Sequence, residues 1–163
     1  EDVTFRRTVI PVQELLDAAG KYFKKLMKNR SERIELEIEP MEAKVIGDVN
    51  QLRFLLENLI DEALTVREDG VIRLQARKDN EYIRFLFTDT RREKSVEELN
   101  QLFYPNLARM TSGEKGELRG TEYLVCKQII RDHDEFAGRR GCRINAEPAE
   151  GGGFTVYFTI PRR

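Results

Sequence analysis

The sequence has few of the residues that mark specialised classes of small protein. Its 163 residues include two cysteines, one histidine and no tryptophan. Cys126, Cys142 and His133 do not stand at the spacing of zinc ligands, and two cysteines are too few for a disulfide framework. We therefore expect neither a zinc site nor a disulfide scaffold, and we interpret the thiols as small core or near-surface side chains.

Long hydrophobic runs and a dominant charge are also missing. The apolar stretches are only a few residues long, far below the ~20 that cross a bilayer, and no signal peptide is visible. We therefore expect no membrane contact by this chain. Lys and Arg number 28 against 29 Asp and Glu, for a net charge of −1. This balance provides no general attraction for nucleic acid.

The composition is that of one folded domain. Hydrophobic residues make up 40 % of the chain, which is enough for a sizeable core, and no internal repeat or linker divides the sequence. We expect residues 1–163 to form a single domain. Because the chain begins at Glu1 and not at a methionine, we expect it to be the C-terminal part of a longer protein.

Residue periodicity predicts the order of the elements. Apolar residues recur at helical spacing in three long segments, and apolar and charged residues alternate in the strands, as in Ile34–Ile38. Ser95 followed by Glu98 is a capping box that starts a short helix. The predicted helices cover residues 12–29, 49–65, 95–103 and 121–133, and the predicted strands cover 3–10, 34–38, 71–78, 82–88, 142–146 and 154–160.

Two turns connect predicted neighbours in the sheet. Asp79 and Asn80 tolerate the left-handed conformations of a tight hairpin, and three consecutive glycines, 151–153, separate the last two strands. Residues 106–119 have no periodicity and are interpreted as a loop. Helices on one face of a mixed, mostly antiparallel sheet form an α+β two-layer sandwich, which is the fold class that we predict.

The second predicted helix carries an unusual polar face. Asn58, Asp61, Glu62 and Thr65 gather within about two turns, opposite the apolar face of the helix. Two interpretations remain open from this pattern alone. The face is either solvated, as on many surface helices, or part of a ligand site.

The order of these motifs resembles the ATP-binding catalytic domain of sensor histidine kinases, which has the Bergerat fold. Residues 45–63 read V-I-G-D-V-N-Q-L-R-F-L-L-E-N-L-I-D-E-A, similar to the family's asparagine box, V-x-G-D-x-x-x-L-x-x-L-L-x-N-L-L-x-N-A-x-K. Asn58 matches the first asparagine. Glu62 stands at the second, which in the family holds Mg²⁺, and Thr65 replaces the lysine. A glutamate oxygen is also a ligand for Mg²⁺, so the resemblance makes Glu62 a metal-binding candidate.

The next box departs further from the family pattern. Asp89 matches the aspartate of the D-x-G-x-G box, which in the family accepts a hydrogen bond from the adenine amino group. Arg91 and Glu93 replace the two glycines. Glycines permit positive φ and close approach of the backbone to a ligand, and long side chains do not.

The phosphate-binding region is also altered. L-F-Y-P at 102–105 is similar to the family's phenylalanine box, and the loop after it corresponds to the lid over the nucleotide. In the segment 120–127, which corresponds to G-L-G-L-A-I-V-K, only Gly120 and Lys127 match outright. Glu122 replaces the second glycine at a helix N-terminus, where main-chain N–H groups would otherwise bind phosphate.

The resemblance implies a module of two-component signalling in the cytoplasm, and the substitutions favour a degenerate one. Our leading hypothesis is a kinase-like ATPase domain that relays signals through contacts with other domains of its parent, or with a response regulator, without phosphotransfer. In the alternative, an active ATP-dependent histidine kinase, Asn58, Glu62, Asp89 and Gly120 bind ATP and Mg²⁺. In a third hypothesis, Arg91 and Arg92 bind a smaller anion, because paired arginines suit bidentate recognition of oxyanions.

Overall fold

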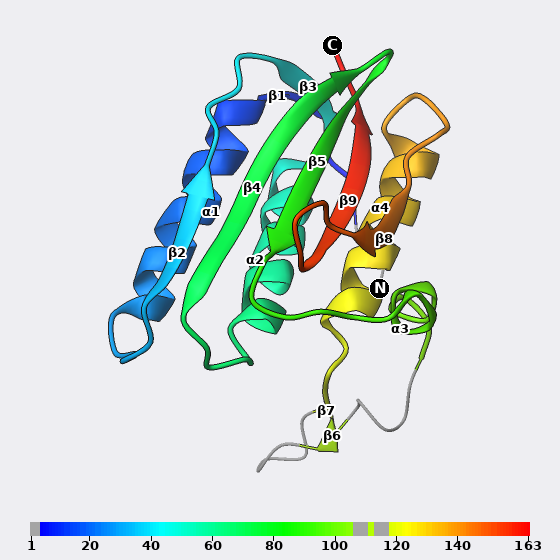
Figure 1. The fold of residues 1–163 in the computed structure, drawn as a ribbon. Helices are drawn as coiled ribbons and strands as arrows, with labels where there is room; N and C mark the ends of the chain where they lie inside the picture. The colour runs from blue at the N-terminus through cyan, green and yellow to red at the C-terminus, as the bar shows by residue number, and fades with distance from the viewer. Residues whose placement is uncertain (1–3, 106–110, 113–117) are drawn as a thin grey trace.

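The computed structural model describes residues 4–105, 111–112 and 118–163. Three long helices and one five-stranded sheet make up most of this part (Figure 1). The helices are α1 (Val12–Met27), α2 (Val49–Ala63), α3 (Val96–Asn100) and α4 (Glu122–Phe136). The strands are β1 (Thr8–Pro11), β2 (Ile34–Ile38), β3 (Lys44–Gly47), β4 (Gly70–Asp79), β5 (Tyr82–Asp89), β6 (Thr111–Ser112), β7 (Leu118–Arg119), β8 (Ile144–Pro148) and β9 (Phe154–Pro161).

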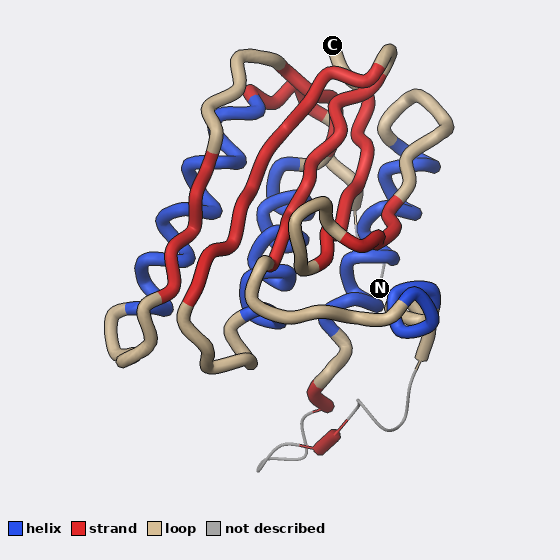
Figure 2. Tube along the Cα trace, in the orientation of Figure 1, coloured by secondary structure: helices blue, strands red, loops and turns tan. Residues whose placement is uncertain are grey.

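The main sheet has the strand order β2-β4-β5-β9-β8. Strands β2 and β4 are parallel, and the other neighbours are antiparallel. Helices α1, α2 and α4 cover one face of this sheet, and no long helix of the described residues covers the other (Figures 1 and 2). The predicted α+β sandwich with a mixed, mostly antiparallel sheet is therefore confirmed.

The core lies between the sheet and the three long helices. Alternate residues of the strands point into it, so β5 buries Ile83, Phe85 and Phe87. The rings of Phe85 and Phe158 stack with their centroids 4.8 Å apart. Both cysteines are free and buried. None of the helices in the described part of the chain has the length and apolar character needed to cross a membrane.

The local predictions agree with the structure in most places. The capping box is present, with the Ser95 side chain accepting from the main chain of Glu98 and the Glu98 side chain from that of Ser95. Asn80 has φ of 56° in the hairpin turn. The bounds differ by a few residues: α1 ends at Met27, α3 ends at Asn100, and α4 continues to Phe136.

The sequence did not predict a separate strand at 44–47. Strand β3 pairs with β1 in a small antiparallel sheet, and an isolated bridge from Val45 to Arg162 connects it to the end of the main sheet. In the loop predicted over 106–119, residues 111–112 and 118–119 form the short β6–β7 pair. Residues 106–110 and 113–117 of that loop lie outside the described residues.

A buried polar network holds the N-terminus of α2. Asp48 is the N-cap, and its carboxylate accepts hydrogen bonds from the main-chain N–H groups of Gln51 (3.1 Å) and Arg6 (2.9 Å). His133 of α4 is fully buried, and its Nε2 accepts the main-chain N–H of Asp48 at 3.0 Å. The other ring nitrogen lies 2.9 Å from the carbonyl of Ile129. The accepting role of Nε2 therefore assigns the proton to Nδ1, in a neutral imidazole.

Candidate functional site

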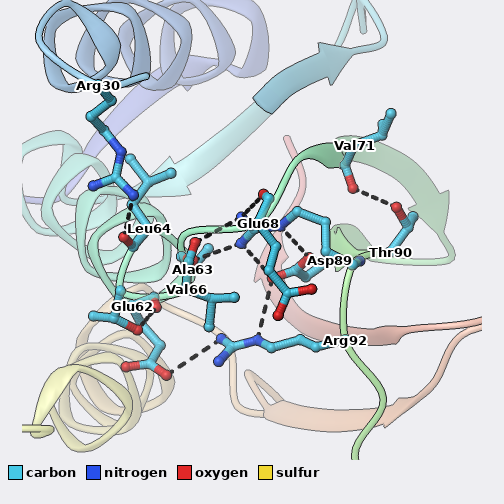
Figure 3. A network of polar contacts seen from close by, with 12 residues as sticks. Arg30, Glu62, Ala63, Leu64, Val66, Glu68, Val71, Asp89, Thr90 and Arg92 are labelled. Carbon is cyan, nitrogen blue, oxygen red and sulfur yellow. Dashed lines mark hydrogen bonds and ion pairs between the residues drawn. The ribbon is translucent and has the colours of Figure 1, made fainter. Parts of the chain in front are cut away.

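Four of the residues predicted to form a site, namely Glu62, Asp89, Arg91 and Arg92, lie around the end of β5. Asp89 is the last residue of this strand and is 2 % exposed. Arg91 and Arg92 follow it, and Glu62 faces them from the last turn of α2. Figure 3 shows Glu62, Asp89 and Arg92 as one connected group. Folding therefore brings together residues that are up to 30 positions apart in the sequence.

Arg91 and Asp89 form the centre of this group. The Nε of Arg91 donates to Oδ1 of Asp89 at 2.9 Å, and Nη2 donates to Oδ2 at 3.0 Å. The main-chain N–H of Arg91 also donates to Oδ1 at 3.0 Å. The side chains of the pair are 1 % and 2 % exposed. Both oxygens of the only carboxylate that the resemblance assigns to adenine are therefore occupied by the chain itself.

Main-chain carbonyls take the remaining donors of Arg91. Nη2 donates to the carbonyl of Ala63 at 2.6 Å, and Nη1 donates to those of Val66 at 3.0 Å and Glu68 at 2.9 Å. These three residues span the last residue of α2 and the connection to β4. Helix C-termini leave carbonyls without intrahelical partners, and Arg91 donates to three carbonyls in this region, although that of Ala63 also accepts the N–H of Val66 at 3.2 Å.

Arg92 is placed between two carboxylates. Its Nη2 lies 3.4 Å from Oε2 of Glu62, and its Nε lies 3.4 Å from Oδ2 of Asp89 (Figure 3). Burial raises the pKa of Glu62, Arg92 opposes this shift, and the carboxylate of Glu122 adds to it. Glu62, the predicted metal ligand, is thus already paired with a cation of the same chain.

Glu93 also turns towards the protein. Its Oε2 accepts the main-chain N–H of Gly153 at 2.8 Å, in the turn between β8 and β9. Gly153 has φ of 86°, and a side chain there would collide with the main chain of Asp89 and Thr90. The residue that replaces the second glycine of the aspartate box therefore joins the end of β5 to this turn.

The polar face of α2 does not form one cluster. The Nδ2 of Asn58 donates to the carbonyl of Phe54 in its own helix at 2.8 Å, and Thr65 donates to the carbonyl of Glu62 at 2.6 Å. Asp61 accepts from the hydroxyl of Tyr22 on α1 at 2.6 Å. Asn58 and Glu62 are buried, so the solvated interpretation of this face is wrong for these two residues.

Gly120 and Glu122 lie at the start of α4. Gly120 has φ of 81°, in the region that favours glycine, and allows the chain to turn into the helix. Glu122 is in the first turn, where a carboxylate interacts favourably with the helix dipole. Its Oε1 is buried and has no hydrogen-bond partner among the described residues.

The carbonyl partners of Arg91 are the main feature that the sequence did not predict. The sequence placed Arg91 two positions after Asp89, which is a signal for an ion pair, but the connection 64–69 carried no motif that pointed to it. A cavity of about 1170 Å³ lies elsewhere, between α1 and β2. Its lining includes Leu16, Phe23 and Leu36.

Comparisons with known proteins identify the fold and the family. The family described as histidine kinase-, DNA gyrase B-, and HSP90-like ATPase matches residues 47–163. The catalytic domain of histidine kinase ThkA, in a nucleotide-free form, is 21 % identical, with a TM-score of 0.73 and 98 % of each chain covered. Comparison with curated proteins gives no match.

Two further solved structures have the same fold. The mycobacterial sensor histidine kinase MprB is 19 % identical, with a TM-score of 0.72, over 97 % of this chain and 99 % of that one. Full-length ShkA, solved in complex with AMPPNP, is 15 % identical, with a TM-score of 0.74, over 99 % of this chain and 32 % of that one.

Proposed function

Because the chain belongs to the histidine kinase-, DNA gyrase B- and HSP90-like ATPase family, we propose that it is a degenerate member, which relays signals through protein contacts without phosphotransfer. The observation that carries this proposal is the pair formed by Arg91 and Asp89. The family binds ATP with Mg²⁺, and the resemblance gives Asp89 the adenine contact. In this chain that contact is made by a guanidinium.

The energy of the pair supports weak nucleotide binding. For adenine to reach Asp89, Arg91 must leave a site where its side chain is 1 % exposed. Separating a buried pair of this kind costs about 3–5 kcal/mol. Every 1.4 kcal/mol is a factor of about ten in affinity, so ATP would bind roughly two to four orders of magnitude more weakly than at an open site.

The metal and phosphate positions support the same proposal. Glu62 is paired with Arg92, and Glu122 stands at the helix N-terminus where the resemblance places phosphate. Like charges about 4 Å apart repel by roughly 4 kcal/mol at an intermediate effective dielectric. Glu62, Glu93 and Glu122 would therefore oppose a bound triphosphate unless cations balanced them.

We further propose the setting in which the domain acts. Residues 1–163 form one domain of a longer sensor or regulatory protein in the cytoplasm, and its partners are the other domains of that protein or a response regulator. A structure of ThkA in complex with response regulator protein TrrA, similar in fold to this chain (TM-score 0.71, 19 % identity), is a precedent for the second partner.

A thermal melt with and without millimolar ATP and Mg²⁺ tests the proposal. Ligand at about a hundred times its dissociation constant would raise Tm by roughly 5–10 °C in a domain of this size. We expect a shift below about 1 °C. A shift of the larger size would support an active kinase, with Glu62 on Mg²⁺ and Asp89 on adenine, and autophosphorylation of the full-length parent would decide against a degenerate domain.

The same melt, run with small phosphates and carboxylates, addresses the anion hypothesis for Arg91 and Arg92. In the structure both guanidinium groups face carboxylates of the chain. An anion would have to replace those carboxylates, so we expect a flat profile. A clear stabilisation by one of these anions would favour a site that has been adapted to a smaller ligand.

A further inference from the structure

All five N–H groups of the Arg91 guanidinium meet an oxygen of the chain. A guanidinium has one N–H on Nε and two on each Nη. Nε donates to one oxygen of Asp89, Nη2 to the other and to the carbonyl of Ala63, and Nη1 to the carbonyls of Val66 and Glu68. The five distances lie between 2.6 and 3.0 Å. The donor set and the acceptor set are therefore matched in number and direction.

The surroundings of Arg91 contain acceptors from three separate segments. They are the end of β5, the end of α2 and the connection between α2 and β4. Without the Arg91 side chain all five oxygens would lose a donor, and the loss is most costly at the buried Asp89, whose Oδ1 would keep only the main-chain N–H of residue 91. A guanidinium can satisfy all five at once, whereas an ammonium has only three donors. The geometry is thus specific for the shape of the cation and not only for its charge.

The backbone beside Arg91 leaves room for its aliphatic arm. A Cβ added to Gly70, the first residue of β4, would lie 2.6 Å from Cγ of Arg91. Gly70 also has φ of 142°, which L residues with side chains rarely adopt. A larger residue at this position would push the arginine out of its place, so Gly70 and Arg91 fit as a pair.

We propose that these five oxygens form a guanidinium-binding site whose resident ligand is the chain's own Arg91. The site joins the end of α2, the connection to β4 and the end of β5. Arg91 keeps it filled because the arginine is covalently attached to the chain. The inference rests on the proposed function in one respect: it names the class of ligand that the altered nucleotide site now takes. The site itself depends only on the geometry.

Chemical rescue of Arg91→Ala tests the site. The substitution removes the atoms of ethylguanidinium, so this cation is the probe. We expect Arg91→Ala to melt at a lower temperature than the unmodified chain. Ethylguanidinium at ten times its dissociation constant should raise the Tm of this variant by about 3–6 °C relative to sodium chloride at the same concentration. The unmodified chain, whose site is filled, should not respond. Ethylammonium at the same concentration should raise the Tm of Arg91→Ala by less than half as much.

Arg84→Ala is the matched control. Arg84 also directs Nε and Nη2 at one aspartate, Asp79, but its side chain is 38 % exposed and it lies in the β4–β5 hairpin. Ethylguanidinium should not stabilise this variant. Equal responses of Arg84→Ala and Arg91→Ala, or no response of Arg91→Ala, would overturn the proposal.

If Arg91→Ala does not fold without the added cation, a refolding experiment replaces the thermal melt. Recovery of the native circular dichroism signal with ethylguanidinium, but not with ethylammonium, would support the site, and no recovery would overturn it. The ATP melt of the unmodified chain separates this inference from the proposed function. Rescue together with ATP binding would support the guanidinium site and contradict the degenerate-domain proposal. No rescue together with no ATP binding would contradict the guanidinium site and support the degenerate-domain proposal.

Discussion

The two ends of α2 are both fixed by buried polar contacts, but the chemistry differs. At the N-terminus, Asp48 caps the helix and neutral His133 accepts the main-chain N–H of Asp48. At the C-terminus, the charged pair of Arg91 and Asp89 binds the helix and the connection that follows it. The first end keeps the residues of the family pattern, and the second contains the substitutions.

The two ends of α2 differ in the groups that satisfy their main-chain hydrogen-bonding atoms. A helix end needs partners for its free main-chain groups. At the N-terminus these partners are acceptors: the Asp48 carboxylate accepts the N–H of Gln51, and Nε2 of His133 on α4 accepts the N–H of Asp48. At the C-terminus Arg91 supplies donors to the carbonyls of Ala63, Val66 and Glu68, at the cost of burying a charge. We therefore expect the C-terminal end to be sensitive to loss of charge and the N-terminal end to be sensitive to shape and to pH.

The largest effect is expected from Asp89→Asn. The variant leaves Arg91 buried without its counter-charge, which typically costs about 3–5 kcal/mol of unfolding free energy. Urea unfolding measures the loss. Asp79→Asn is the control, because its pair with Arg84 is 36–38 % exposed and exposed pairs contribute about 0–1 kcal/mol. Equal small losses in both variants would mean that the charge at the C-terminal end is unimportant.

Gly47→Ala should have the next largest effect, at the other end of the helix. The added Cβ would lie 2.8 Å from Cδ2 and Nε2 of His133, and overpacking of this kind costs about 1–3 kcal/mol. Unfolding free energies of Gly47→Ala, His133→Ala and the double variant check the contact. Because the smaller residue makes room, the double variant should lose less than the sum, and simple additivity would contradict this.

Asp48→Ala should destabilise the domain by about 0.5–2 kcal/mol, as for other N-cap residues. It removes the oxygens that accept from Gln51 and Arg6. Asp48→Asn retains an acceptor for the cap and should lose less. Chemical denaturation of both variants tests this order, and a reversal would indicate that charge, not capping, is the contribution of Asp48.

The pH dependence of His133 is expected to be the smallest effect at neutral pH and to grow below it. Burial lowers the pKa of His133, although Asp48 and Asp132 oppose the shift. The unfolded chain, with an ordinary histidine pKa near 6.5, therefore takes up this proton first as the pH falls. Stability is retained above about pH 6.5 and is lost below it.

Unfolding free energies between pH 5 and 8, compared with those of His133→Gln, isolate this contribution from the carboxylates. The difference between the two proteins should be constant above about pH 7 and should change as the pH falls below 6.5. A constant difference over the whole range would mean that His133 titrates alike in the folded and unfolded states.

The secondary structure was predictable from the sequence wherever residues close along the chain determine it. Alternation predicted β4 and β5, and the Ser95 and Glu98 pair predicted the start of α3. Strand β3 escaped prediction because four residues carry too little periodicity and its partner β1 lies more than 30 residues away. The parallel pairing of β2 with β4 likewise depends on how the intervening helix packs.

For the site, the sequence by itself determined which residues replace the glycines and therefore that carboxylates and arginines stand near the end of β5. Only the tertiary structure decided their partners. Arg91 finds the carbonyls of Ala63, Val66 and Glu68, and His133 finds a main-chain N–H 85 positions away. The physical reason is that main-chain carbonyls and N–H groups occur at almost every residue, so no sequence pattern identifies which of them folding leaves free and buried beside a given side chain.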